Sequence, residues 1–300
     1  MPSAISIRGL TKRYGKLVAV DHLDLEVSRG EVFGFLGLNG AGKTTTIRIL
    51  LDLLRPSSGN AAIFGHDCQT DSLQARASIG YLPGEMGGYS NLTGHELLTY
   101  LERIGGGPVS SEYRNKLAKR FDLSDLDLSR KLREYSTGMK RKLGLIQAFQ
   151  ADPMLLILDE PTEGLDPLMQ EAFYDLVAEA RNRGRTVFMS SHVLPEVERV
   201  CDRIAVLRMG KVVLLSTVHD ARKLARRRVR VVFQQDVAVP TGLPQGYDMI
   251  EAKPRNWILG VSGQLGALPS LLASLPVADL AIEEARLEDV LVKYYRDGGE

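Results

Sequence analysis

Apolar and polar positions divide the chain into a zone of strands, a zone of helices and a zone in which the two alternate. Three strand-like stretches come first, at Ala4–Leu10, Val18–Val27 and Glu31–Leu36. Lys43–Leu54 then carries apolar residues at helical spacing and ends at an Arg-Pro-Ser-Ser-Gly turn. Ala61–Phe64 is expected to form another short strand. Strands on both sides of a loop predict a mixed sheet beside a parallel one.

A helical zone follows, from about residue 71 to residue 134. Its clearest signal is a capping box, in which Thr93 begins a helix and Glu96 stands three residues later. His95 lies inside this helix start, and we interpret it as structural. The zone predicts a helical subdomain over about residues 85–150.

Strands and helices alternate after residue 153. The continuous apolar run Met154–Leu158 predicts a buried parallel strand. Asp166 and Pro167 are a favourable N-cap and first residue for the next helix, and Gly184 is placed to end it. Further strands are expected at Thr186–Ser190, Ile204–Leu207 and Val212–Leu215.

The composition of the chain changes near residue 218, where we place a domain boundary. The basic run Arg222–Arg230 has two interpretations: a solvated basic helix at a domain edge, or a contact with anionic lipid or an acidic partner. Beyond it we expect strands at Val229–Phe233, Trp257–Val261 and Val277–Ile282, and helices at Gln264–Leu275 and Leu287–Tyr295. These elements predict a small α+β domain over residues 219–300, with an accessory or regulatory role.

Composition narrows the class of protein. The 300 residues are 44% hydrophobic and 25% charged, as in ordinary globular domains, and a net charge of +1 gives no overall attraction to nucleic acid. Cys68 and Cys201 are too few for a disulfide framework and indicate a reducing compartment. The sequence shows neither a signal-peptide core nor an apolar run of roughly 18–20 residues, so we expect a soluble, cytoplasmic protein.

Residues 37–44 read Gly-Leu-Asn-Gly-Ala-Gly-Lys-Thr, which matches the phosphate-binding loop G-x-x-x-x-G-K-[ST]. The loop stands between an apolar strand and a helix, where backbone N–H groups and the helix N-terminus attract phosphates. Lys43 is expected to reach the β- and γ-phosphates, and Thr44 to ligate Mg²⁺. The predicted contacts to a nucleoside triphosphate are Gly37, Asn39, Gly40, Ala41, Gly42, Lys43, Thr44 and Thr45.

Two acids end the strand predicted over residues 154–158. Asp159 is positioned to hold Mg²⁺, and Glu160 is positioned to orient or deprotonate a water molecule beside the γ-phosphate. Adjacent acids after a strand are common, but here they follow a phosphate-binding loop. The pair therefore predicts hydrolysis of the bound nucleotide.

The stretch Leu132–Arg141 decides the family. Its Ser136-Thr137-Gly138-Met139-Lys140 segment resembles the signature motif of the ATP-binding subunits of ATP-binding cassette (ABC) transporters, with Thr137 at a position that is usually Gly. The resemblance implies that Ser136, Thr137 and Gly138 face the γ-phosphate held by a second subunit. Two subunits, identical or different, then close around two ATP molecules.

The resemblance extends over about residues 4–218 and implies a P-loop NTPase core with an antiparallel β subdomain and a helical subdomain. Tyr14 matches the aromatic residue that stacks on adenine. The segment that ends at Asp166 matches the one that crosses the dimer interface, with Glu163 where Ser or Ala is frequent. His192 matches the switch histidine, which senses the γ-phosphate.

One position departs from the family. After the strand Ile79–Pro83 the family has Gln or Glu, which contacts Mg²⁺ and the attacking water, whereas this chain has Gly84 followed by Glu85. Because Gly84 leaves the backbone free to move, we expect Glu85 to take over as a ligand of the metal or of water. The alternative is that Glu85 is a solvated acid beside the membrane subunit.

The function implied by the resemblance is an ATPase that dimerises on ATP and drives a membrane-spanning permease from the cytoplasmic face of the membrane. The Tyr-Ser-x-Gly-Met-Lys-Arg signature and the C-terminal domain are similar to ATPases of exporters for drugs, antibiotics, lipids or polysaccharides. An importer subunit and a soluble ABC protein outside transport stay open. A small kinase does not explain the signature and His192, and a chromosome-maintenance ATPase needs long coiled coils that this chain has no room for.

Overall fold

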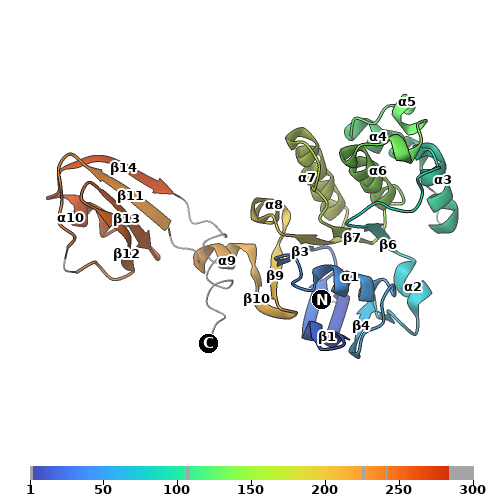
Figure 1. The fold of residues 1–300 in the computed structure, drawn as a ribbon, viewed down its shortest axis with the longest axis horizontal. Coiled ribbons are helices and arrows are strands. Elements are labelled where there is room, and N and C mark those ends of the chain that lie inside the picture. Colours follow the sequence, from blue (N-terminus) through green and yellow to red (C-terminus); the bar gives the residue numbers. More distant parts are fainter. Residues whose placement is uncertain (1–2, 106–108, 225–226, 241, 284–300) are drawn as a thin grey trace. The chain divides into compact units, whose positions relative to one another are not determined.

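The computed structural model describes residues 3–105, 109–224, 227–240 and 242–283. The chain divides into two compact units, Met1–Leu215 and Ser216–Glu300, and the sequence predicted a boundary near residue 218. Each unit is described separately below (Figure 1).

An antiparallel sheet begins the first unit. Its strands, in spatial order, are β2 (Leu17–Ser28), β1 (Ser3–Tyr14), β4 (Ser58–Ile63) and β5 (His66–Asp67). β1 and β2 alternate largely between buried and exposed residues, because one face of the sheet covers the core. Both strands are longer than the sequence predicted, and the antiparallel β subdomain is confirmed.

A second sheet forms the centre of this unit. Its strands, in spatial order, are β10 (Lys211–Thr217), β9 (Arg203–Arg208), β3 (Val32–Gly37), β8 (Thr186–Ser191), β7 (Leu155–Asp159) and β6 (Ile79–Leu82). From β9 to β6 neighbouring strands run parallel. Every residue of β3, β7 and β8 is buried, and for β7 the continuous apolar run predicted this. The carboxyl ends of β3 and β7 therefore meet at one edge, where α/β proteins place ligands.

Helices flank this sheet and build a separate helical region (Figure 1). Those in contact with the sheets or beside them are α1 (Lys43–Leu50), α2 (Ser72–Arg76), α6 (Thr137–Phe149), α7 (Pro167–Asn182) and α8 (Leu194–Val200). The helical subdomain adds α3 (Gly94–Gly105), α4 (Ser111–Arg120), α5 (Asp125–Leu128) and the 3₁₀ turn Leu132–Glu134. α1 ends four residues earlier than predicted, since Asp52 has a left-handed backbone with φ of 56°.

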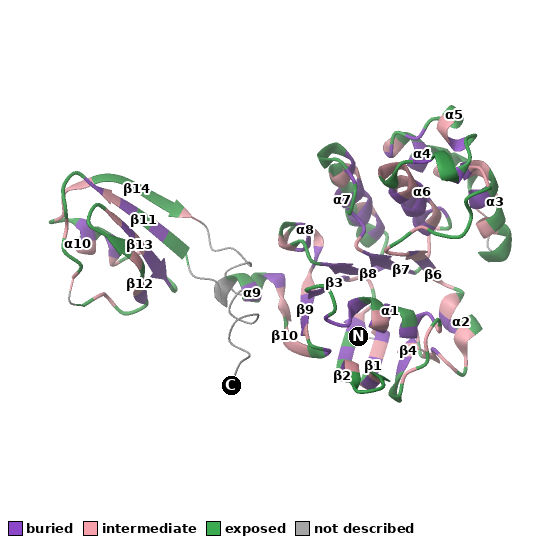
Figure 2. Ribbon diagram, in the orientation of Figure 1, coloured by how far each residue is buried: buried purple, intermediate pink, exposed green. Residues whose placement is uncertain are grey.

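One apolar core joins the two sheets of the first unit. Phe188 in β8 packs against Phe33 and Phe35 in β3, with ring centroids 5.9 and 5.1 Å apart. Ile47 and Leu50 bring α1 into the same cluster. Figure 2 shows the buried residues concentrated along the strands of the parallel sheet. This packing fixes the carboxyl ends of β3, β7 and β8, which carry or precede the polar residues of the site described below.

The predicted capping box is present at the start of α3. The Thr93 N–H donates to Glu96 Oε2 at 2.8 Å, and the Glu96 N–H donates to Thr93 Oγ1 at 3.2 Å. Thr93→Ala removes the second bond, so we expect the free energy of unfolding to fall by about 1 kcal/mol. Urea denaturation measures this loss, with Thr99→Ala at a partly exposed position inside the same helix as the control. Equal stability of the two variants would contradict a stabilising cap.

The second unit is a four-stranded antiparallel sheet with short helices, counted over its described residues. Its elements are α9 (Val218–Leu224), β11 (Arg227–Phe233), β12 (Tyr247–Lys253), β13 (Asn256–Val261), α10 (Leu268–Leu272) and β14 (Val277–Glu283). The strand order is β12-β13-β11-β14. Trp257 packs edge-on against Phe233 at 4.6 Å between ring centroids, at the centre of a separate apolar core. The predicted α+β class holds for this part of the chain.

Three predictions for this unit were wrong. The helix expected over Gln264–Leu275 is limited to Leu268–Leu272, because Gly266 and Pro269 disfavour a longer one. The basic run is not one helix: it continues into β11, where exposed Arg228 alternates with buried Val229. β12 was missed, since its charged residues hide the strand pattern. The helix expected at Leu287–Tyr295 lies outside the described residues.

A candidate nucleotide-binding site

The loop between β3 and α1 depends on glycines at two close approaches. A Cβ on Gly42 would lie 2.5 Å from the Ala19 carbonyl oxygen, and φ of Gly42 is +111°. A Cβ on Gly37 would lie 2.8 Å from both the Ala41 Cβ and the Leu207 carbonyl oxygen. Gly42 is also the N-cap of α1, so the loop leads directly into the helix N-terminus. Free N–H groups and the helix dipole make this end of α1 attractive to phosphate.

Lys43 is held at the start of α1 with its ammonium group directed to the edge of the sheet. Its side chain is 6% exposed. Nζ donates to the Gly37 carbonyl oxygen at 2.5 Å and lies 3.2 Å from Glu160 Oε1. The buried cation is thus oriented by its own loop and by the acid at the end of β7.

Asp159 at the end of β7 is buried, and both of its carboxylate oxygens accept hydrogen bonds. Thr44 Oγ1 donates to Oδ2 at 3.1 Å, and Ser190 Oγ at the end of β8 donates to Oδ1. The Thr44–Asp159 pair joins residues 115 positions apart, because β3 and β7 end at the same edge of the sheet. A hydroxyl and a carboxylate are hard oxygen donors of the kind that Mg²⁺ prefers.

Glu160 connects Lys43 to the residue expected to be the switch histidine. Its Oε2 lies 2.8 Å from His192 Nδ1 and accepts from the His192 N–H at 3.3 Å. Its N–H donates to the Ser190 carbonyl oxygen at 3.1 Å. Glu160 has φ of 51°, an uncommon conformation for a residue other than Gly and one that concentrates at functional sites. The two oxygens of one carboxylate thus face a lysine and a histidine.

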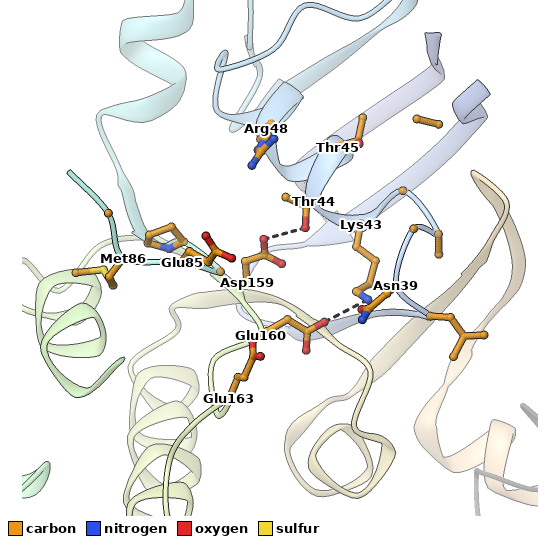
Figure 3. A pocket seen from close by; sticks show the side chains of 18 of the residues that line it. Asn39, Lys43, Thr44, Thr45, Arg48, Glu85, Met86, Asp159, Glu160 and Glu163 are labelled. Atoms are coloured by element: carbon orange, nitrogen blue, oxygen red, sulfur yellow. Dashed lines mark hydrogen bonds and ion pairs between the residues drawn. The ribbon is translucent and has the colours of Figure 1, made fainter. Parts of the chain in front are cut away.

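Lys43, Thr44, Asp159 and Glu160 line a cavity of about 1110 Å³ (Figure 3). Tyr14 and Leu17 lie at its β1–β2 end, and Gly84 and Glu85 at its β6 end. Its other polar lining residues include Asn39, Lys43, Thr44, Thr45, Arg48, Thr137, Lys140, Arg141, Asp159, Glu160 and Glu163. The cavity therefore combines an exposed aromatic side chain, a phosphate-type loop, cations and acids in one volume.

Four of the predicted nucleotide contacts, Gly37, Ser136, Gly138 and Asp166, do not line this cavity. Gly37 ends β3, and its carbonyl oxygen accepts from Lys43 Nζ. Ser136 Oγ accepts from the Met139 N–H at 3.2 Å and caps α6, and Gly138 lies in the first turn of that helix. Asp166 caps α7 by accepting from the Met169 N–H at 3.0 Å, which confirms its predicted local role. Within one chain, Ser136, Gly138 and Asp166 thus lie at the N-termini of α6 and α7.

Sequence reasoning missed two buried charged residues near the site. Arg141 in α6 is 6% exposed and bonds to carbonyl groups of three other segments. Glu196 in α8 is 3% exposed, and burial raises its pKa to about 7, although Ser191 Oγ donates to it at 2.9 Å and opposes the rise. Glu196 and His192 line a second cavity of about 330 Å³. Arg141 ends the Tyr-Ser-x-Gly-Met-Lys-Arg signature, but the motif gives it no role, and Glu196 lies in no motif. Only the tertiary structure shows that both are buried beside the site.

The described part of the chain contains no cluster of three or more His, Cys, Asp or Glu side chains that could hold a metal ion. Mg²⁺ commonly binds one or two carboxylates plus substrate phosphates and water, so it needs no such cluster. Over the same residues, no helix has the length and apolar character needed to cross a bilayer.

Known proteins resemble this chain over nearly its full length. The family model described as ABC transporter matches residues 20–163. The bacitracin transport ATP-binding protein BcrA of Bacillus licheniformis is 35% identical, over 99% of each chain. The daunorubicin resistance ATP-binding protein DrrA3 of Streptomyces coeruleorubidus is also 35% identical, over 95% of this chain and 92% of the relative.

Solved structures agree with the fold. The ATP-binding subunit of an ABC transporter superposes with a TM-score of 0.68 and 31% identity, covering 74% of this chain and 92% of that one. A bacterial ABC transporter cassette solved as a dimer gives a TM-score of 0.65 at 24% identity, over 71% and 98% of the two chains. The chain described here therefore belongs to the ATP-binding cassette family and is the ATP-binding, ATP-hydrolysing subunit of a transporter.

Proposed function

We propose that the chain hydrolyses Mg²⁺-ATP with Glu160 as the general base, within a dimer that drives an exporting permease. The observation that carries this proposal is the convergence of Lys43, Thr44 and Asp159 with Glu160 at one edge of the parallel sheet. Few other reactions need a phosphate-binding lysine, a pair of oxygen donors and a further carboxylate at such spacing.

Each residue has a separate task in this proposal. Lys43 binds the β- and γ-phosphates, and Tyr14 stacks on the adenine at the other end of the cavity. Thr44 and Asp159 would hold Mg²⁺, and the bound ion would supply positive charge beside the phosphate oxygens. Glu160 accepts a proton from the attacking water, and His192 orients the Glu160 carboxylate and senses the γ-phosphate.

The exposed start of α6 supports a composite site shared by two chains. Ser136 and Thr137 are exposed, at the N-terminus of a helix of 13 residues. A helix N-terminus attracts anions, and in this proposal it meets the γ-phosphate bound by a second subunit. ATP then favours the closed dimer, and hydrolysis returns the pair to the open state.

Export is the direction that the relatives support. The names of two relatives refer to bacitracin transport and daunorubicin resistance, and their similarity extends through the C-terminal unit. We assign the chain to the cytoplasmic face of the membrane, held there by transmembrane permease subunits. Residues 219–300 would aid dimerisation or docking, and exposed Arg227, Arg228 and Arg230 offer a surface for anionic lipid.

Copurification from detergent-solubilised membranes tests the partnership. The tagged full chain is expected to bring down a membrane-spanning permease, and ATPase activity in lipid nanodiscs should exceed that of the isolated chain. Recovery of a periplasmic binding protein in the complex would indicate import. Recovery of no membrane protein, with full ATPase activity in the isolated chain, would contradict the transport role.

Glu85 lies on the cavity beside the Mg²⁺-binding residues of the proposal (Figure 3). A Cβ on Gly84 would already lie 3.3 Å from Asp159 Oδ2, so the backbone itself approaches the carboxylate. If Glu85 serves as a ligand of the metal or of water, Glu85→Ala should lower permease-stimulated ATPase activity by about tenfold while ATP affinity stays within about twofold. Glu112→Gln on α4 is the control. Unchanged activity and transport in Glu85→Ala would remove Glu85 from the site.

A further inference from the structure

Arg141 lines the cavity but has no role in the proposed mechanism. Among the described cations that line the cavity, it is a buried one whose guanidinium group is hydrogen-bonded on all three nitrogens. It directly follows the signature segment Ser136–Lys140 in α6 and is 6% exposed. Burial lowers its pKa, while Glu163, Asp159 and Glu160 act in the opposite direction. Arginine is rarely buried without a set of acceptors, so its contacts indicate its role.

The guanidinium group bonds first to the loop after β6. Nη1 donates to the Pro83 carbonyl oxygen at 2.9 Å, and Nη2 donates to the Gly84 carbonyl oxygen at 2.7 Å. This loop carries Glu85 and stands where other family members have the glutamine. Because Gly84 has no side chain, other residues can fix its position only through its backbone, and Arg141 does so through the carbonyl oxygen.

The same group bonds to two further segments. Nη1 donates to the Asp159 carbonyl oxygen at 3.4 Å, at the end of β7. Nε donates to the Glu163 carbonyl oxygen at 3.2 Å, and Nη2 lies 3.7 Å from Glu163 Oε2. Arg141 thus touches the loop at position 84, the strand end that bears Asp159, and the segment that leads to α7.

We propose that Arg141 is a positioning residue that ties the Pro83–Gly84 loop to the Asp159 strand end and the Glu163 segment. A rigid fork of five N–H donors serves all of these acceptors at once, which an ammonium group on a flexible stem does not. A displacement of the loop is thereby passed to the residues that hold Mg²⁺ and the attacking water. A movement of the loop at Gly84 thus reaches the end of β7 through Arg141 and two backbone carbonyl groups, although position 84 has no side chain.

The inference rests on the proposed function, and its test compares Arg141→Gln and Arg141→Lys with Lys142→Gln. The control removes a neighbouring, partly exposed cation from the same helix. ATPase kinetics are measured on the full chain, and amide hydrogen exchange of residues 84–86 is followed by mass spectrometry with and without ATP. ATP binding is measured separately in the Glu160→Gln background.

We expect Arg141→Gln to lower kcat by about ten- to a hundredfold, with KM within about twofold, since a shift of about 1 Å in a catalytic group costs up to about 10²-fold. Amide exchange at residues 84–86 should become faster and lose its response to ATP. Arg141→Lys keeps the buried positive charge and so protects against misfolding, and we expect it to fail to restore either readout. Lys142→Gln should match the wild type in both.

Two results overturn the proposal. Full recovery of kcat in Arg141→Lys would show that charge alone matters, and unchanged loop exchange in both Arg141 variants would show that the contacts transmit nothing. Wild-type protein without any ATPase activity would refute the proposed function itself. Active wild-type protein with an equally active Arg141→Gln variant would refute only the positioning role.

Discussion

Glu160→Gln is expected to bind ATP with near wild-type affinity and to hydrolyse it at least roughly a hundredfold more slowly, because a positioned general base contributes about 10²–10⁴ in rate. The amide keeps the size of the side chain but cannot accept the proton of the attacking water. Its oxygen can still accept from the His192 N–H, so the local geometry changes little. Phosphate release under single-turnover conditions measures the effect directly.

The control for this variant is Glu112→Gln, the same chemical change at a side chain that is 77% exposed on α4. It should leave the hydrolysis rate unchanged. A Glu160→Gln rate within a fewfold of wild type would mean that another group activates the water, and Glu163 and Glu85 would then be the next carboxylates on the cavity to test.

Lys43→Ala is expected to weaken ATP binding by about ten- to a hundredfold and to abolish measurable hydrolysis, because a hydrogen bond to a charged group is worth about 1.5–3 kcal/mol. The substitution also leaves Glu160 without the cation that lies 3.2 Å away. Equilibrium titration with a fluorescent ATP analogue measures affinity. Lys119→Ala, at an exposed site on α4, should bind as the wild type does. Equal affinity of the two variants would exclude Lys43 as a phosphate ligand.

The fold of the first unit could be predicted from the sequence because its strands carry unambiguous patterns. β3 and β7 are buried on both faces and are short apolar runs, and their length together with Gly30 before β3 and Pro153 before β7 favours strands over helices. The second unit has a weaker signal. β12 carries Asp248, Glu251 and Lys253 at the edge of a sheet, and pairing to β13 overrides its local preference.

The site divides in the same way. The closeness of Lys43, Asp159 and Glu160 could be predicted, because Lys43 follows β3 by one short loop and the two acids stand at the end of β7 in the same parallel sheet. Arg141 and Glu196 could not, since their partners are mostly backbone groups or residues without a motif. A buried charge needs partners, and these can be sought in a sequence when they are charged or polar side chains. Every residue has a backbone carbonyl group, so partners of that kind cannot be found from the sequence.

The central claim is that ATP joins two chains through the phosphate-binding loop of one and the start of α6 of the other. The most direct test is the solution mass of Glu160→Gln, measured by light scattering with and without Mg²⁺-ATP, beside the same variant carrying Ser136→Arg. Ser136 is exposed and caps α6, so the long arginine side chain removes the cap and fills the space that the phosphate group of a second chain would enter. We predict that ATP raises the mass from one chain to two, and that Ser136→Arg abolishes the increase while ATP still binds. A mass that does not respond to ATP, or an ATP-dependent dimer that survives both Ser136→Arg and the repulsive Ser136→Glu, would contradict the claim.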